Sequence, residues 1–148
     1  MIDRIHGTIA LVLLAWVLLG GPSQAQSPSL KDRLVGHWQL VSINIADTAP
    51  YGSSPQGSMF LDSGGHYSVI IVTGGDARSV GYFGTYTVDE ADNTVTMHVV
   101  AGTRASAAGR DEKRQVTLNG DQLVLQRPQS PGPAAALGTV KLTWQRSN

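Results

Sequence analysis

The stretch Leu34-Val-Gly-His-Trp-Gln-Leu-Val-Ser-Ile43 decides how the rest of the chain is interpreted. Apolar and polar side chains alternate along it, which is typical of a half-buried β-strand. Trp38 stands at the head of this strand, and a similar run near the other end of the chain reads Leu142-Thr-Trp-Gln-Arg146. A tryptophan on a first strand and an arginine on a last strand indicate a small closed β-barrel with a plugged floor.

Short runs of β-branched and aromatic residues, separated by turn residues at regular spacing, fill the chain between these two segments. Asn119-Gly120 is the strongest hairpin signal, because both central positions of such a turn require positive φ. Consecutive pairing predicts an all-β fold, an eight-stranded antiparallel up-and-down barrel, since closure removes exposed sheet edges. A two-sheet sandwich is the alternative. The expected strands cover residues 34–45, 56–61, 66–73, 81–89, 94–101, 112–118, 122–127 and 139–146.

The first 25 residues have the features of a signal peptide. An apolar run from Ile9 to Leu19 precedes Ser23-Gln24-Ala25, whose small residues suit signal peptidase, and the run is too short for a membrane span. We expect residues 1–25 to be a signal peptide, 26–33 an N-terminal arm and 34–148 the barrel domain. The mature protein would be exported, to the periplasm or outside the cell, with no stable membrane span. An uncleaved anchor is the alternative.

Composition excludes several classes of site. The chain has no cysteine, so disulfides and thiolate metal sites are absent. The 11 basic and 11 acidic residues balance and form no basic stripe, which argues against nucleic-acid binding. His37 and His66 have no partner at metal-ligand spacing, so we predict no metal and no cofactor. No nucleophile motif is present either, and the sequence favours a binding protein over an enzyme.

Alternation along each strand predicts which side chains line the barrel. The first strand would turn Trp38, Leu40, Ser42 and Asn44 inward. The fifth strand is ambiguous, because either Val95, Met97 and Val99 or the set containing His98 faces in. An eight-stranded barrel is filled by side chains or holds one small ligand. The mixture of apolar and a few polar residues favours a small-molecule pocket.

Seven strand motifs follow one another along the chain: Leu34-Val-Gly-His-Trp-Gln-Leu-Val-Ser42, Gly57-Ser-Met-Phe-Leu61, Gly65-His-Tyr-Ser-Val69, Gly84-Thr-Tyr-Thr-Val-Asp89, Val95-Thr-Met-His-Val99, Gly120-Asp-Gln-Leu-Val-Leu125 and Leu142-Thr-Trp-Gln-Arg146. This ordered set resembles the lipocalin-like domain family of small bacterial and fungal proteins. The chain departs from the family in the small-residue run Ala101-Gly-Thr-Arg-Ala-Ser-Ala-Ala-Gly109, where members often carry a longer acidic or aromatic stretch.

The resemblance implies a lipocalin-type barrel in which Trp38 packs across the closed end and Arg146 covers its ring, as a structural plug. Within such a barrel we expect a small hydrophobic molecule as the partner. The enzymatic alternative is an isomerase or cyclase acting in the same cavity, and the third is a fully packed barrel that serves as an envelope interaction module. The candidate ligand-binding residues are Tyr67, Tyr82, Tyr86, His98, Arg114 and Leu40.

Overall fold

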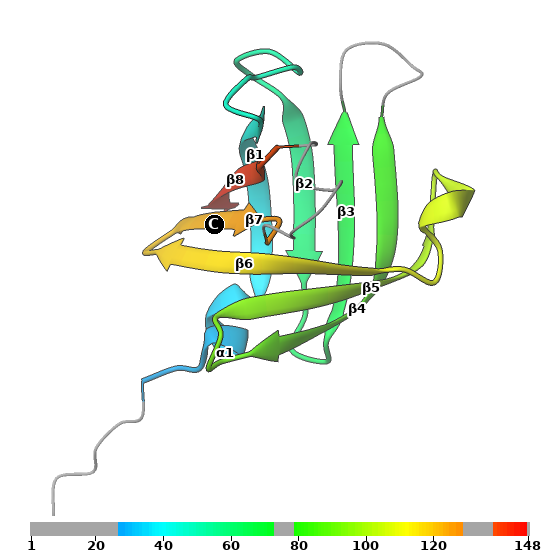
Figure 1. Ribbon diagram of the computed structural model, residues 1–148. Helices are drawn as coiled ribbons and strands as arrows, with labels where there is room; N and C mark the ends of the chain where they lie inside the picture. Colours follow the sequence, from blue (N-terminus) through cyan, green and yellow to red (C-terminus); the bar gives the residue numbers. More distant parts are fainter. Residues whose placement is uncertain (1–26, 73–78, 129–137, 148) are drawn as a thin grey trace, which may run out of the picture.

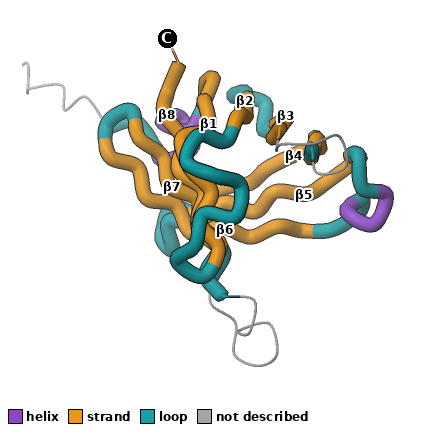
Figure 2. The backbone as a smooth tube through the Cα atoms, turned by 90° about the horizontal axis from the view of Figure 1, so that it is seen from above, coloured by secondary structure: helices purple, strands orange, loops and turns teal. Residues whose placement is uncertain are grey.

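The computed structural model describes residues 27–72, 79–128 and 138–147, and these form a closed barrel of antiparallel strands in chain order (Figures 1 and 2). The eight-stranded up-and-down barrel predicted from the sequence is therefore confirmed, and the sandwich is excluded, because β1 pairs with β8. The strands are β1 (Gly36–Ile45), β2 (Gln56–Leu61), β3 (His66–Val72), β4 (Val80–Asp89), β5 (Thr94–Gly102), β6 (Asp111–Asn119), β7 (Gln122–Gln126) and β8 (Val140–Ser147).

The predicted signal peptide, residues 1–25, lies outside the described residues, as does most of the long connection between β7 and β8. Within the described ranges, no helix is both long and apolar enough to cross a membrane.

A short helix, α1 (Leu30–Leu34), lies beside the turn that joins β4 and β5 (Figure 1). Ser29 and Asp32 form a capping box at its N-terminus. The Glu90 carboxylate of that turn accepts hydrogen bonds from the Leu30 and Lys31 backbone N–H groups, at 2.8 and 3.1 Å. The carboxylate thus satisfies helix N-terminal donors that have no partner within the helix. Leu30 and Leu34 are buried against the barrel.

The barrel interior is built mainly from apolar side chains that alternate with exposed ones along each strand. The side chains that are almost completely buried come from α1 and from strands between β1 and β8. Burial of this apolar surface is the main source of stability, at roughly 25 cal/mol per Å². The largest of these residues are Trp38, Trp144, Leu34, Met59, Leu123, Val69, Val95 and Val99.

A β-bulge in β1 corrects the predicted inward face of that strand. Pairing with β8 shifts register between Leu40 and Ser42. The extra residue inverts the alternation beyond it. Ile43 is consequently buried, and Ser42 and Asn44, which were expected to share the face of Trp38 and Leu40, do not continue that inward row.

The fifth strand takes the more apolar of its two possible orientations. Val95, Met97 and Val99 are each at most 3% exposed, whereas His98 is exposed on the outer face. Burying three apolar side chains is favoured over burying an imidazole that would need a polar partner inside the barrel.

Candidate functional site

Four inward-facing polar side chains lie together in the barrel interior. Tyr67 comes from β3, Tyr82 from β4, and Glu112 and Arg114 from β6. Glu112 and Arg114 alternate with exposed residues on β6 and lead into the buried Val116, which places both on its inner face. We refer to these four residues as the polar cluster.

The two tyrosines of the polar cluster pack edge to face. Their ring centroids are 6.0 Å apart and their planes are inclined by 73°, a favourable arrangement for aromatic pairs. Tyr67 is directly opposite Gly84 of β4, which has no side chain to compete for the space. A bulge between Phe83 and Gly84 follows at this point of the β4–β5 pairing.

The two charged members of the polar cluster neutralise one another. Arg114 Nη2 lies 2.5 Å from Glu112 Oε2, and Arg114 Nη1 donates to the Lys113 backbone carbonyl at 2.9 Å. The Arg114 and Glu112 side chains are only 13% and 22% exposed. Arg114 was predicted to bind a ligand, but Glu112 of the same strand already pairs with it. Glu112 was not predicted from the sequence, although residues two apart on one strand share a face and the spacing of Glu112 and Arg114 could have indicated their pairing.

The Tyr67 hydroxyl is buried and has no hydrogen-bond partner among the described residues. Burial is the main cause that raises the pKa of Tyr67 above its ordinary value, with a further increase from Tyr82 and Glu112 and an opposing effect of Arg114. Burial likewise raises the pKa of Tyr82, with Arg114 opposing it and Glu112 adding to it. Both hydroxyls therefore remain protonated at neutral pH and can donate hydrogen bonds. Thr94 Oγ1 and Trp144 Nε1 are also buried without a partner among the described residues, and the charges of Glu112 and Arg114 act on Tyr67.

Tyr86 and Leu40 have structural positions in the interior. The Tyr86 hydroxyl donates to the Asp62 backbone carbonyl at 2.6 Å, so it is already used. Leu40 is 6% exposed and packs opposite Gly57, whose missing Cβ would lie 3.0 Å from a Leu40 methyl carbon. Both residues face inward as expected, and their predicted ligand contact stays a prediction.

The prediction that His98 binds a ligand inside the barrel is wrong. Its ring lies outside, where Nδ1 is 2.8 Å from Asp111 Oδ1 of the neighbouring strand. Both side chains are at least half exposed. The orientation of β5, fixed by its valines and Met97, removes His98 from Arg114, and the two residues do not meet.

Trp38 and Arg146 lie together at the end of the barrel that α1 covers. Arg146 Cζ is 4.1 Å from the centroid of the Trp38 ring. Trp38 Nε1 donates to the Leu34 carbonyl at 2.8 Å. Trp38 is fully buried, and its contacts belong to the plug rather than to the polar cluster.

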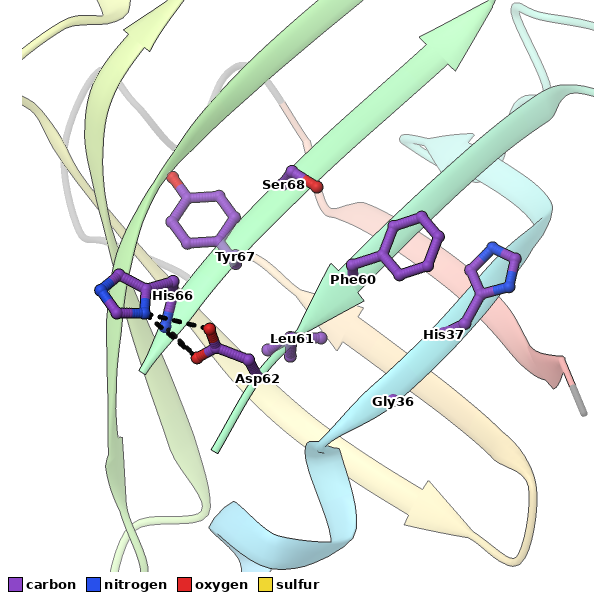
Figure 3. A pocket seen from close by; sticks show the side chains of 8 residues that line it. All are labelled: Gly36, His37, Phe60, Leu61, Asp62, His66, Tyr67 and Ser68. Carbon is purple, nitrogen blue, oxygen red and sulfur yellow. Dashed lines mark hydrogen bonds and ion pairs between the residues drawn. The ribbon is translucent and has the colours of Figure 1, made fainter. Parts of the chain in front are cut away.

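A groove of about 460 Å³ lies along β1, β2 and β3, and Tyr67 of the polar cluster is one of its lining residues (Figure 3). The His37 and Phe60 rings stack there, with centroids 4.2 Å apart and planes inclined by 2°. His66 Nδ1 lies 3.0 Å from Asp62 Oδ2. Tyr67 and Ser68 both line the groove and project from β3 in opposite directions (Figure 3). The sequence analysis missed the groove, because it arises from residues brought together by strand pairing.

Within the described part of the chain, no group of three or more potential ligands is placed to hold a metal ion. Comparison of the sequence with protein-family models finds no matching family, and comparison with curated proteins finds no significant relative.

Proposed function

We propose that this protein binds a small, mainly apolar molecule inside its barrel. The observation that carries the proposal is the polar cluster within an otherwise apolar, closed interior, with the Tyr67 hydroxyl buried and unpartnered. Small-molecule sites typically combine apolar walls with a few polar groups that fix orientation. The resemblance to lipocalin-like proteins and the predicted export agree with a binding role outside the cytoplasm.

Equilibrium binding is favoured over catalysis by the chemistry of the cluster. An isomerase or cyclase would need a group that accepts a proton near neutral pH. His98, the best candidate from the sequence, points away from the interior. The raised pKa of Tyr67 and of Tyr82 keeps both hydroxyls protonated, and the Glu112 carboxylate is bound to Arg114. The interior therefore offers hydrogen-bond donors and apolar contact rather than a free base.

Neighbouring aromatic residues of β4 supply a matched test of where the ligand binds. Tyr82 is half-buried and faces in, whereas Phe83 is 52% exposed and faces out. Binding of the fluorescent apolar probe phenylnaphthylamine would be titrated against the native protein and the variants Tyr82→Ala and Phe83→Ala. Loss of an aromatic contact of about 1.4 kcal/mol corresponds to about tenfold weaker binding.

We expect Tyr82→Ala to weaken binding of the probe about tenfold and Phe83→Ala to leave the Kd of the probe unchanged. Circular dichroism of each variant establishes that the barrel is retained. Equal weakening by both variants, or weakening by Phe83→Ala alone, would place the probe on the outer wall and contradict the proposal. Native mass spectrometry of protein purified without denaturing steps would then show whether a molecule of a few hundred daltons accompanies the chain.

A further inference from the structure

The polar cluster carries no net charge at neutral pH. The Glu112 carboxylate and the Arg114 guanidinium cancel, and both tyrosines are neutral, since the ordinary pKa of a tyrosine is about 10 and burial raises it further. The charged groups that act on both tyrosine hydroxyls are this one pair. A charged ligand that enters the interior would therefore find no unpaired residue of opposite charge in the polar cluster.

The cluster also has a free donor. Tyr67 is 4% exposed, and its hydroxyl has no partner among the residues that the structure describes. Arg114 already donates to Glu112 and to the Lys113 carbonyl, so within the polar cluster the Tyr67 hydroxyl is the buried donor that lacks an acceptor. A ligand atom that accepts a hydrogen bond would remove the cost of leaving this group unsatisfied.

We propose that the interior site selects uncharged ligands that carry a hydrogen-bond acceptor, such as an ester, ketone or aldehyde oxygen, and discriminates against carboxylates of the same chain length. This inference rests on the proposed function, because it concerns the same interior site. The acceptor oxygen would receive the Tyr67 hydroxyl, and the apolar remainder would pack against the barrel wall.

Electrostatics explains the discrimination. A carboxylate placed beside the cluster would lose its hydration and would be repelled by Glu112, while Arg114 is already engaged at 2.5 Å. A cationic ligand would be repelled by Arg114, while Glu112 is already paired. Unpaired charge in a poorly hydrated site is a strong source of specificity, since it penalises the wrong ligand more than it rewards the right one.

Three probes of equal chain length test the proposal: methyl octanoate, octanoate and octylammonium. Each would be measured by displacement of phenylnaphthylamine from the native protein at neutral pH. We expect methyl octanoate to bind at least about tenfold more tightly than either ion, since a charge-assisted partner is lacking for both. Tyr67→Phe should weaken the ester by about fivefold, as expected for one neutral hydrogen bond.

Removing the charge of Glu112 should reverse the preference. In Glu112→Gln, Arg114 lacks its counter-ion, and octanoate should become the tighter ligand by at least about tenfold over the ester. Arg127→Gln is the matched control, because Arg127 is a half-buried cation that directly follows β7 outside the polar cluster. This variant should keep the native order of affinities. If Glu112→Gln does not fold, the double variant Glu112→Gln/Arg114→Gln should fold and still prefer the ester.

The outcomes separate this inference from the function on which it rests. Tighter binding of octanoate than of methyl octanoate to the native protein would overturn the neutral-ligand selectivity and leave interior binding intact. An unchanged order of affinities in a folded Glu112→Gln variant would also overturn it. Displacement of the probe by none of the three molecules would instead count against interior binding itself.

Discussion

Arg146 of β8 covers the ring of Trp38 of β1, with its guanidinium carbon 4.1 Å from the ring centroid. The same guanidinium donates to the Val35 and Arg33 backbone carbonyls, at 2.8 and 2.5 Å. One side chain near the end of the last strand thus holds the first strand and the segment that leads into it from α1. The hydrogen bonds and the ring contact of this pair are made within the protein, which gives the pair a structural role.

Replacing Arg146 with Met should destabilise the fold while retaining an apolar stem. The variant loses a cation–π contact and two charge-assisted hydrogen bonds, so the free energy of unfolding should fall by about 2–4 kcal/mol. Arg110→Met is the control, because Arg110 is exposed. Urea unfolding followed by tryptophan fluorescence would measure both. Equal stability of the Arg146 variant and the control would contradict the structural role of this contact.

Two inward tyrosines should respond in opposite ways to loss of the hydroxyl. Tyr86→Phe removes a hydrogen bond to the Asp62 carbonyl and should lower the free energy of unfolding by about 1 kcal/mol. Tyr67→Phe removes a buried hydroxyl that has no partner among the described residues, so stability should be unchanged or slightly higher. Thermal unfolding of the two variants in parallel tests the assignment. A clear loss of stability in Tyr67→Phe would mean that its hydroxyl is satisfied in the unliganded protein.

Glycine at position 84 should be essential, whereas glycine at position 81 on the same strand should not. A Cβ on Gly84 would overlap the His98 backbone carbonyl across the β4–β5 bulge. A Cβ on Gly81 would make ordinary contact, at 3.5 Å from a Thr103 methyl carbon. Gly84→Ala should therefore cost at least about 2 kcal/mol and Gly81→Ala less than about 0.5 kcal/mol. Similar unfolding midpoints for the two variants would show that the bulge tolerates a side chain.

The buried tyrosines predict a loss of stability in alkaline solution. Burial raises the pKa of Tyr67, Tyr82 and Tyr86, so the folded state retains phenolic protons that the unfolded state releases near about pH 10. The stabilisation is fully present below that pH and is lost as pH rises toward the folded-state pKa values. Urea unfolding at a series of pH values above about 9 should show the decline, and Tyr67→Phe should reduce its slope. A slope unaffected by this substitution would contradict the burial of the phenol.

Much of the barrel could be predicted because its information is local. Alternation in β1 and β8, and turn residues such as Gly120, specify strands and hairpins without knowledge of distant residues. The predicted central pair of that turn was wrong by one residue, because Asn119 pairs with Gln122 and the positive φ falls on Gly120. The inward positions of Tyr67 and Tyr82 followed from the same alternation. The β1 bulge was not visible, because the register shift between Leu40 and Ser42 appears only where β1 meets β8, about a hundred residues later in the chain.

The polar cluster was predicted only in part, for a related reason. Alternation along the strand correctly predicted that Arg114 faces inward, but Glu112 was not predicted as its partner. The real partner is Glu112, two residues away on the same strand face. His98 illustrates the reverse error. Its strand offered two faces, and the packing of Val95, Met97 and Val99 against the whole core decided between them.

The most direct test of interior binding is to detect contacts between a bound probe and named side chains. Nuclear Overhauser effects would be recorded between methyl octanoate and the aromatic rings of the isotope-labelled protein. Interior binding predicts contacts to the Tyr67 and Tyr82 rings and none to Phe60 and Phe83, which are 53% and 52% exposed on the outer wall. Contacts to Phe60 or Phe83, without contacts to the two tyrosine rings, would contradict the proposed function.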